Sequence, residues 1–284
     1  MPLWQHAKKL ALTTNMRAQL SGDEKAKEFA DKLLQVGNGT FAIDEHSGQI
    51  ELANELCNVV ETPEQLIEEV YPNIQKNYSN KEWLCERAIL ATKNEVVENI
   101  NETVQKMIQG EEKTYKSIDT IVNENESVNF PTEFLNSLNA PGMPLHSLKL
   151  KVGSPIILLR NLNSPTLCNG TRLCVKQLLN NIIEAEIMVG KEKGKSVFIP
   201  RIPLISNELF ICFKRLQFPV KLAYSMTINK AQGQTLKWRG VNLIEACFSH
   251  GQLYVACFRV GRSNHLFIYA PNNKTPNIVY KQIL

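Results

Sequence analysis

One stretch in the first half of the chain constrains the fold most, because a strand-like run passes directly into a helix-like run. Residues 87–92 (RAILAT) form a short, mainly apolar segment, and residues 93–110 follow with apolar side chains at helical spacing. The apolar positions of this second run are Val96, Val97, Ile100, Val104, Met107 and Ile108. A strand followed at once by an amphipathic helix is typical of an open α/β sheet, so we expect an α/β fold.

Two further helix starts precede this unit. Ser21 and Glu24 form a capping box ahead of an apolar stripe, and Gly37 is the expected stop of that helix. Thr62 and Pro63 indicate a second start, with the proline at the first helical position. Both patterns predict helices that pack an apolar face on a sheet.

From Leu148 onward the pattern changes to short strands separated by Asn, Gly, Pro and Lys turns, notably Asn169-Gly170. The strand-like segments are 152–162, 169–179, 181–189 and 195–205. After Pro219 the α/β pattern returns, with strands expected in 220–225, 240–245 and 265–270 and a helix in 249–260. We therefore expect a small all-β barrel or meander, residues 143–204, inserted into a discontinuous α/β domain of residues 1–142 and 205–284.

Charge is distributed unevenly along the chain. Residues 1–140 hold 13 Lys and Arg against 23 Asp and Glu, whereas residues 141–284 hold 19 against 5. A basic half poor in carboxylates suits a polyanionic partner, because each phosphate that is neutralised releases condensed counterions. A solvated basic surface without a partner remains the alternative.

Composition excludes several classes of protein. With 284 residues and 43% apolar residues, the chain can bury a sizeable core. It contains no apolar stretch near the roughly 20 residues of a membrane span, and no apolar signal core at its start, so we expect a soluble intracellular protein without a membrane partner. The seven cysteines are scattered and never spaced C-x-x-C, which favours reduced, buried thiols over disulfides or a zinc cluster.

Two segments imitate nucleotide-binding motifs. Residues 190–196 (GKEKGKS) resemble a phosphate-binding loop, but three residues separate the glycines where the motif needs four, and the run joins two strand-like segments. We interpret it as a basic hairpin turn. Residues 41–45 (FAIDE) imitate a magnesium-binding acid pair, but Gly48 and the short apolar run favour a turn. No complete nucleotide-triphosphate loop lies in these 284 residues.

Histidines, cysteines and tryptophans give weaker signals. His250 and Cys257 lie seven residues apart on an expected helix, without a third group to orient the imidazole, so we expect a packed cysteine. Trp4, Trp83 and Trp238 are candidates for stacking on nucleobases, but packing in the core is the favoured interpretation.

Three short stretches together resemble the late motifs of superfamily-one DNA helicases. They are residues 12–17 (LTTNMR), 223–235 (AYSMTINKAQGQT) and 249–259 (SHGQLYVACFR). The similarity is to the petite-integration-frequency (Pif) family, and within it to helicases encoded by Helitron transposons, and it extends over nearly all 284 residues.

The resemblance implies a motor of two RecA-like domains with ATP in the cleft between them. In that family the first domain carries the phosphate loop and the Mg²⁺-binding acid pair, and this chain resembles the second RecA-like domain with an inserted barrel of the Src-homology-three type. Its implied partners are single-stranded DNA, ATP and a separate first domain, with ATP and Mg²⁺ both requiring that first domain. Movement from 5′ to 3′ and nuclear work in DNA repair, recombination, telomere maintenance or transposition are further implications.

The resemblance also assigns roles to individual residues. Arg17, in the fourth motif, and Arg259, in the sixth, are the catalytic candidates, because a planar cation from a facing domain stabilises the charge that develops on the γ-phosphate. Pairing of either arginine with a surface carboxylate is the alternative. Gly233 and Gln234 are candidates for contacting the nucleotide. The DNA-binding candidates are Thr227, Asn229, Lys230 and His250.

Three positions depart from the family pattern. Phe258 replaces the usual serine beside Arg259, the second arginine of the following segment is displaced to Arg262, and Asn229 stands where related helicases often have histidine. The first two changes would weaken ATP turnover. Two other functions therefore remain open, a stand-alone module that binds single-stranded DNA without ATP and an inactive remnant of a transposon.

Overall fold

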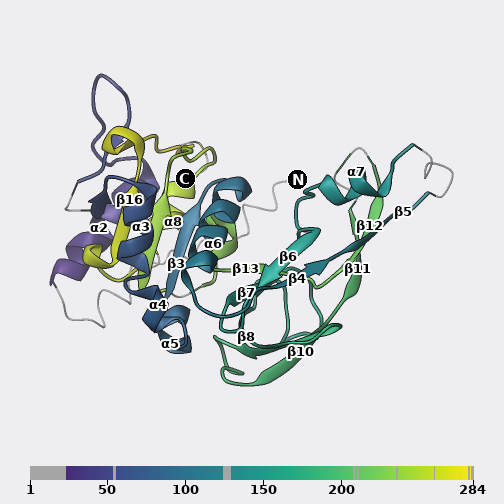
Figure 1. The fold of residues 1–284 in the computed structure, drawn as a ribbon. Coiled ribbons are helices and arrows are strands. Elements are labelled where there is room, and N and C mark those ends of the chain that lie inside the picture. Colours follow the sequence, from purple (N-terminus) through teal and green to yellow (C-terminus); the bar gives the residue numbers. More distant parts are fainter. Residues whose placement is uncertain are drawn as a thin grey trace, which may run out of the picture.

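The computed structural model describes residues 24–53, 56–123, 129–206, 209, 211–234, 236–258, 260–280 and 282. Two lobes stand side by side in Figure 1: one has helices around a parallel sheet, and the other consists mainly of antiparallel strands. The first lobe combines the early part of the chain with its last sixty or so residues, whereas strands from the middle of the chain build the second. The α/β class expected from the sequence is confirmed.

The first lobe contains a five-stranded sheet in the order β14-β3-β15-β16-β2, and all four strand pairs are parallel. Its strands are β2 (Asn58–Val60), β3 (Arg87–Ala91), β14 (Ser225–Thr227), β15 (Trp238–Asn242) and β16 (Leu266–Tyr269). A smaller antiparallel pair joins β1 (Ile50–Glu51) to β17 (Lys274–Thr275). The strand-then-helix unit lies at the centre, because β3 is followed by helix α6 (Asn94–Met107).

Helices cover both faces of this sheet. Helices α2 (Glu24–Asn38) and α8 (Gln252–Cys257) pack on one face, and α3 (Pro63–Val70), α4 (Ile74–Asn77), α5 (Lys81–Cys85) and α6 pack on the other. Strand β3 shows why two cores form, since Leu90 belongs to the first apolar cluster and its neighbour Ile89 to the second. Successive strand residues point to opposite faces, so a strand that is apolar throughout must be covered twice.

Both expected helices are present with shifted ends, whereas Ser21 of the expected capping box lies outside the described residues. The Thr62 hydroxyl accepts a hydrogen bond from the Gln65 amide at 3.1 Å, with Pro63 as the first helical residue. Helix α2 passes through Gly37 and ends at Asn38, and Gly39 adopts the left-handed conformation with φ of 66°. The stop is therefore one glycine later than expected, because Gly39 has the conformation that ends a helix. Helix α8 is shorter than the expected 249–260 and begins after Gly251, which is also left-handed.

The second lobe is built from three antiparallel sheets. The largest has the order β10-β9-β8-β7-β13, a second has the order β11-β12-β5, and β4 pairs with β6. The strands are β4 (Lys113–Lys116), β5 (Ile118–Ile121), β6 (Ser147–Leu150), β7 (Pro155–Leu158), β8 (Arg172–Leu178), β9 (Ile182–Ile187), β10 (Ser196–Pro200), β11 (Ile202–Ser206), β12 (Phe213–Gln217) and β13 (Val220–Leu222). Helix α7 (Thr132–Ser137) covers the three-stranded sheet, which extends away from the rest of the molecule in Figure 1.

The strand segments expected between 152 and 205 are present, with one difference. Residues 195–205 form two strands in different sheets, because β10 ends at Pro200 and β11 starts at Ile202. Pro200 and Pro203 lack an N–H group, which disfavours one uninterrupted ladder through this segment. Strands β4, β5, β12 and β13 lie outside 143–204, β11 extends past 204 to Ser206, and all of them pair within the same lobe. The ladders of the described strands do not join β10 to β13, so the barrel and its boundaries stay predictions.

The segment 220–227 crosses from the antiparallel lobe to the parallel-sheet lobe where the two are in contact. Residues 220–222 pair with β7 in the antiparallel sheet, and residues 225–227 pair with β3 in the parallel sheet. Beside this crossing, the fully buried side chain of Arg172 on β8 donates to the carbonyl oxygens of Cys85 at 2.9 Å and Arg87 at 3.1 Å. A charged donor thus links the antiparallel sheet to the start of β3.

Candidate nucleic-acid interface

The polar stretch 227–234 lies at the carboxyl end of β14, the edge strand of the parallel sheet nearest the antiparallel lobe. Strand β14 ends at Thr227, and a short 3₁₀ helix, η3 (Ile228–Ala231), follows it. Ligands of open α/β sheets bind beyond the carboxyl ends of the strands. The structure therefore places this stretch at an edge where such folds bind ligands.

A buried asparagine on α6 fixes where β14 begins. The Asn101 Oδ1 atom accepts from the Ser225 amide at 2.8 Å, and Asn101 Nδ2 donates to the carbonyl oxygens of Ser225 at 3.0 Å and Leu222 at 3.3 Å. These bonds satisfy backbone groups at the point where the chain leaves one sheet for the other. The position of Thr227 is consequently tied to α6.

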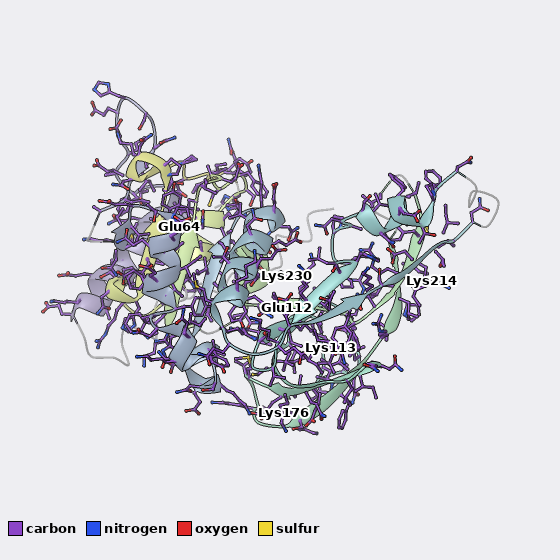
Figure 2. The ribbon with its side chains drawn as sticks, in the orientation of Figure 1. Glu64, Glu112, Lys113, Lys176, Lys214 and Lys230 are labelled. Atoms are coloured by element: carbon purple, nitrogen blue, oxygen red, sulfur yellow. The ribbon has the colours of Figure 1, made fainter. Side chains whose placement is uncertain are left out.

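A groove of about 390 Å³ runs between α6 on one side and β6, β7 and β13 on the other. Thr227 and Lys230 both line it, and so do residues along the whole of α6, from Asn94 to Lys106. Figure 2 shows Lys230 and Glu112 in the region between the two lobes. Two of the DNA-binding candidates thus line a groove that residues of both lobes form.

Charges of both signs line the groove. The cations are Lys106, Lys149, Lys221 and Lys230, and the carboxylates are Glu98, Glu102 and Glu112. Glu98 is paired, because its Oε1 atom lies 3.1 Å from Lys221 Nζ. The interior is consequently not a uniformly basic channel, and attraction for a phosphate backbone is concentrated at individual lysines such as the exposed Lys230.

The end of the polar stretch contacts the turn between β7 and β8. Gln234 Nε2 donates to the Gly170 carbonyl oxygen at 3.0 Å, and Lys230 Nζ donates to Asn169 Oδ1 at 3.1 Å. Gly233 between them has φ of 86° and open space where a Cβ would stand, so glycine is needed for its conformation and not for packing. The two nucleotide candidates, Gly233 and Gln234, thus form a turn that bridges both lobes.

The remaining DNA-binding candidates do not line this groove. Asn229 is exposed on η3. His250 stacks on Tyr280 with ring centroids 5.5 Å apart, and its Nδ1 atom accepts from the Tyr280 amide at 3.0 Å. The structure therefore brings together Thr227, Lys230 and the Gly233–Gln234 turn, and it leaves His250 in a separate contact with the C-terminal segment.

Both catalytic candidates, Arg17 and Arg259, lie outside the described residues, and their roles stay predictions. The adjacent Phe258 is half-buried and stacks on Tyr254, with ring centroids 4.7 Å apart. Tyr254 in turn contacts α2, because a Cβ built on Gly37 would lie 3.0 Å from its ring. The aromatic ring at the family's serine position thus takes part in packing α8 against α2.

The segments that imitate nucleotide-binding motifs are turns, as expected. Residues 190–194 form the β9–β10 hairpin turn, closed by a bond from the Gly194 amide to the Ile187 carbonyl oxygen. Asp44 accepts from the amides of His46 and Ser47 and pairs with Lys274 at 2.7 Å. Neither segment presents a phosphate cradle at a helix start.

The expectation of buried thiols holds for four of the seven cysteines, whereas Cys85 and Cys168 are half-buried and Cys212 is exposed. Cys257 is 1% exposed, and burial raises the pKa of its thiol well above the usual range. Burial likewise raises the thiol pKa of Cys247 to about 12. A thiol that stays protonated is a poor nucleophile, so the pairing of His250 with Cys257 does not form a reactive site. Trp83 and Trp238 lie 4.3 and 5.6 Å from the Arg87 guanidinium, whereas Trp4 lies outside the described residues.

The basic half of the chain exposes less positive charge than the sequence indicates. Arg172, Arg215 and Arg239 are among the largest fully buried side chains. Several lysines of the antiparallel lobe are paired as well, including Lys176 with Glu184 at 3.0 Å. Figure 2 places Lys113, Lys176 and Lys214 along this lobe, and none of the three lines the groove. The net charge counted from the sequence of this half is therefore larger than the unpaired positive charge that its surface presents to a polyanion.

Sequence reasoning missed the polar residues on the buried side of α6. Asn101 is 6% exposed and Gln105 is 2% exposed, and both line the groove. Their signal is present in the sequence, since two amides four residues apart interrupt the apolar stripe Val97, Ile100 and Val104. A buried amide needs partners, so an amide pair on an apolar face predicts a polar contact there.

The part of the chain that the structure describes contains no group of three or more His, Cys, Asp or Glu side chains arranged to hold a metal ion. Within the same residues, no helix combines the length and the apolar character that crossing a bilayer requires.

Comparison with known proteins identifies relatives of one kind. Residues 133–178, from α7 to β8, match the family model described as DNA helicase Pif1, 2B domain. The ATP-dependent DNA helicase Pif1 of Campylobacter jejuni is 29% identical over 53% of this chain and 35% of its own length. The ATP-dependent DNA helicase PIF6 of Trypanosoma brucei brucei is 30% identical over 46% of this chain and 18% of its own length.

Solved structures agree at the level of the fold. The crystal structure of Pif1 helicase from Candida albicans has a TM-score of 0.60 at 21% identity and covers 94% of this chain and 57% of its own. Pif1 helicase from Bacteroides in complex with ADP-AlF3 and ssDNA has a TM-score of 0.58 at 22% identity, covering 90% and 52%. The chain spans about a third or less of the curated relatives it matches and about half of the solved chains. Over the part that it shares with these relatives, the chain is similar to DNA helicases of the Pif1 family.

Proposed function

We propose that this chain is the second motor domain, the C-terminal part, of an ATP-dependent DNA helicase that moves 5′ to 3′ along single-stranded DNA. Support comes from relatives named as ATP-dependent DNA helicases and from a structural neighbour solved with ADP-AlF3 and ssDNA. The 284 residues contain no complete phosphate loop, so turnover of ATP requires a first RecA-like domain from elsewhere.

The observation that carries this proposal is the position of Thr227 and Lys230. Both lie at the carboxyl end of β14 and line the groove between the lobes, next to the turn that touches the β7–β8 connection. A hydroxyl and an ammonium group at one edge suit phosphate and sugar contacts of a strand. The groove runs across both lobes, so a change in their relative position would act on a bound strand directly.

ATP would be held between this chain and the first domain. The Gly233–Gln234 turn is exposed and open, with no atom within 4 Å of a Cβ built on Gly233, so a nucleotide can approach its backbone. Arg17 and Arg259 would supply cationic groups to the γ-phosphate. Mg²⁺ would be held by the first domain.

The antiparallel lobe would act as an inserted barrel of the Src-homology-three type, residues 143–204, within a RecA-like domain of residues 1–142 and 205–284. The match of residues 133–178 to a 2B domain model supports a distinct unit there. Work in the nucleus and an origin in a Helitron transposon belong to the same proposal, and they rest on the sequence resemblance alone.

Binding of single-stranded DNA tests the first half of the proposal. Fluorescence anisotropy of a labelled oligothymidylate should report affinity that falls steeply as salt is raised, because lysine–phosphate contacts release counterions. Lys230→Ala should weaken binding about threefold to tenfold, the scale of one phosphate contact. Lys176→Ala is the matched control, because Lys176 lies on the antiparallel lobe away from the groove. Equal losses for both variants would contradict a specific role of Lys230.

ATP turnover tests the second half. The chain alone should not hydrolyse ATP in the presence of single-stranded DNA. After addition of a separately produced first domain, turnover should appear and should fall by about a thousandfold in Arg259→Ala, as for other charge-stabilising arginines. The same assay on Arg17→Ala separates the two candidates. Turnover by the chain alone would show that the phosphate-loop function is present after all.

One alternative function rests on a specific observation. The groove and its lysines lie within this chain, whereas no phosphate loop does, so a module that binds single-stranded DNA without ATP needs nothing further. That function predicts that the chain binds single-stranded DNA in a salt-dependent way, and that adding a first domain does not produce ATP turnover. An inactive remnant, which Phe258 favours, predicts no binding even at low salt.

A further inference from the structure

The groove between the lobes has a floor with unused hydrogen-bonding capacity. Gln105 is 2% exposed, its Oε1 atom accepts from the Ser154 hydroxyl at 2.8 Å and the Tyr224 hydroxyl at 3.2 Å, and its Nε2 atom has no partner among the described residues. The Ser225 hydroxyl, on a residue that is 1% exposed, likewise has none there. Both residues line the groove.

Buried polar groups without partners are costly, and natural proteins leave few of them. Two of them in one groove indicate that a ligand or water completes their hydrogen bonds. An amide N–H requires an acceptor, and a hydroxyl can donate or accept. The floor therefore suits a ligand atom such as a carbonyl oxygen or a ring nitrogen.

The walls of the groove are mainly apolar. Val97 on α6 stands on one side, and Leu148, Ile157 and Leu159 of the antiparallel lobe stand on the other. A volume of about 390 Å³ lies within the range of small-molecule pockets and exceeds the space that a single nucleobase needs. Enzymes that flip a base out of its stack hold the planar base between apolar side chains and form hydrogen bonds to its edge.

Charge decides which end of a nucleotide enters. Glu102 and Glu112 line the groove, and the structure gives neither a cationic partner within the described ranges. Lys106, Lys149 and Lys221 line the groove as well, so its charge is mixed, and an uncharged base enters it without the repulsion that Glu102 and Glu112 exert on a phosphate. Lys230 and Thr227 lie where the groove meets the carboxyl end of β14, so the phosphates can stay at that edge.

Building on the proposed function, we propose that the groove between α6 and the antiparallel lobe is a pocket for one unstacked base of the bound single strand. Gln105 Nε2 and the Ser225 hydroxyl contact the edge of that base. Lys230 holds the adjoining phosphate. The strand is thereby gripped through a base at the junction of the two lobes, and not through its backbone alone.

The test compares two strands that differ only in their bases. An oligothymidylate and an abasic strand of the same length, made with tetrahydrofuran sites, are titrated into the full chain at fixed salt. We expect the thymidylate to bind about tenfold tighter, the scale of a single base contact. Equal affinities in the unchanged chain would overturn the base pocket and leave salt-dependent strand binding intact.

Two variants locate the preference in this groove. Val97→Phe fills the groove from α6 and should bring the thymidylate affinity down to that of the abasic strand, without changing the abasic affinity. Asn99→Phe places the same ring on the exposed side of α6, away from the groove, and should keep the tenfold preference. A Val97→Phe protein that still prefers thymidylate tenfold would overturn the inference.

The role of the floor is tested with a base isostere. A difluorotoluene nucleotide has the shape of thymine but lacks its carbonyl acceptors, so the unchanged chain should favour thymine severalfold. Gln105→Glu keeps the acceptor for Ser154 and Tyr224 and removes the N–H donor, so it should abolish that difference. If neither the thymidylate nor the abasic strand binds at low salt, the proposed function and this pocket are both overturned. If both strands bind with equal affinity, only the pocket is overturned.

Discussion

Two ion pairs of nearly equal length lie in the two lobes, in opposite surroundings. In the antiparallel lobe, Arg215 Nη2 lies 2.6 Å from Asp119 Oδ2, and both side chains are fully buried. In the parallel-sheet lobe, Lys274 Nζ lies 2.7 Å from Asp44 Oδ2, and the side chains are 31% and 21% exposed. Distance alone does not distinguish them.

Burial makes their energetic roles different. Arg215 contacts both oxygens of Asp119 and also donates to the carbonyl oxygens of Leu135 and Pro144. It thereby connects β12 and β5 to the segment around α7, where the apolar cluster is smaller than either core of the parallel sheet. The parallel sheet has an apolar core on each face, so its ion pairs can remain at the surface. A thin antiparallel arm depends on a buried charge for its organisation, and a sheet covered twice does not.

The largest effect is expected when the buried pair is broken. Arg215→Met leaves the Asp119 carboxylate buried without its cation, and we expect the free energy of unfolding to fall by about 3–5 kcal/mol. Urea denaturation followed by circular dichroism measures the loss.

The double variant Arg215→Met with Asp119→Leu is the control for that loss. It removes both charges, so it should recover most of the stability, because an apolar pair of similar volume can replace a buried ion pair. A double variant as unstable as Arg215→Met would show that the carbonyl contacts of Arg215, and not the unpaired carboxylate, dominate the loss.

Arg172 gives the next effect, because it is buried without a carboxylate. Its guanidinium donates to the carbonyl oxygens of Leu84, Cys85 and Arg87, and burial lowers its pKa. Arg172→Met leaves no charge behind, so we expect a loss of about 2–3 kcal/mol, smaller than for Arg215→Met. The same denaturation experiment measures it, and a loss that exceeds that of Arg215→Met would contradict the ranking.

Packing in the parallel-sheet lobe gives a third, smaller effect. Gly240 on β15 lies under α3, where a Cβ would come within 2.8 Å of Val70 Cγ2 and 3.1 Å of Ile89 Cγ1. Gly240→Ala should therefore cost about 1–3 kcal/mol through overpacking. Adding Val70→Ala makes room, so the double variant should be more stable than the sum of the two single losses indicates. Simple additivity would exclude this contact as the cause.

How much the sequence predicts also differs between the lobes. The strand-then-helix unit of β3 and α6 and the cap at Thr62 follow from local patterns, since the residues that interact are neighbours in the chain. The pairing of β5 with β12 joins residues almost a hundred positions apart, and no local pattern indicates it. The burial of Arg172 and Arg215 is equally hidden, because an arginine in an alternating strand predicts a solvent-facing side chain.

The candidate site shows the same limits. Resemblance alone indicates the polar stretch 227–234. Thr227 and Lys230 both line the groove, and their contact with DNA stays a prediction. Gln105 and Ser225, which form its floor, carry no motif, and only the packing of α6 against β14 makes them significant. Arg17 and Arg259 stay predictions, because their roles depend on a facing domain.

The smallest effect is expected for the exposed pair. Hydrogen bonds from Lys274 and from Ser47 lower the pKa of the Asp44 carboxyl below its usual range. A carboxyl with a lower pKa in the folded state stabilises the fold above its unfolded pKa of about 3.9, and that contribution disappears as the pH falls through the folded value. Asp44→Asn should therefore leave stability nearly unchanged at low pH, lower it slightly at neutral pH, and flatten the acid limb of the stability curve.

Glu45→Gln, which alters an adjacent exposed carboxylate without a cationic partner in the described chain, should leave that limb as it is. If the two variants change the curve equally, the pair at 2.7 Å contributes no more to stability than an ordinary surface charge does. Solvent screening can reduce the contribution of an exposed ion pair to that level.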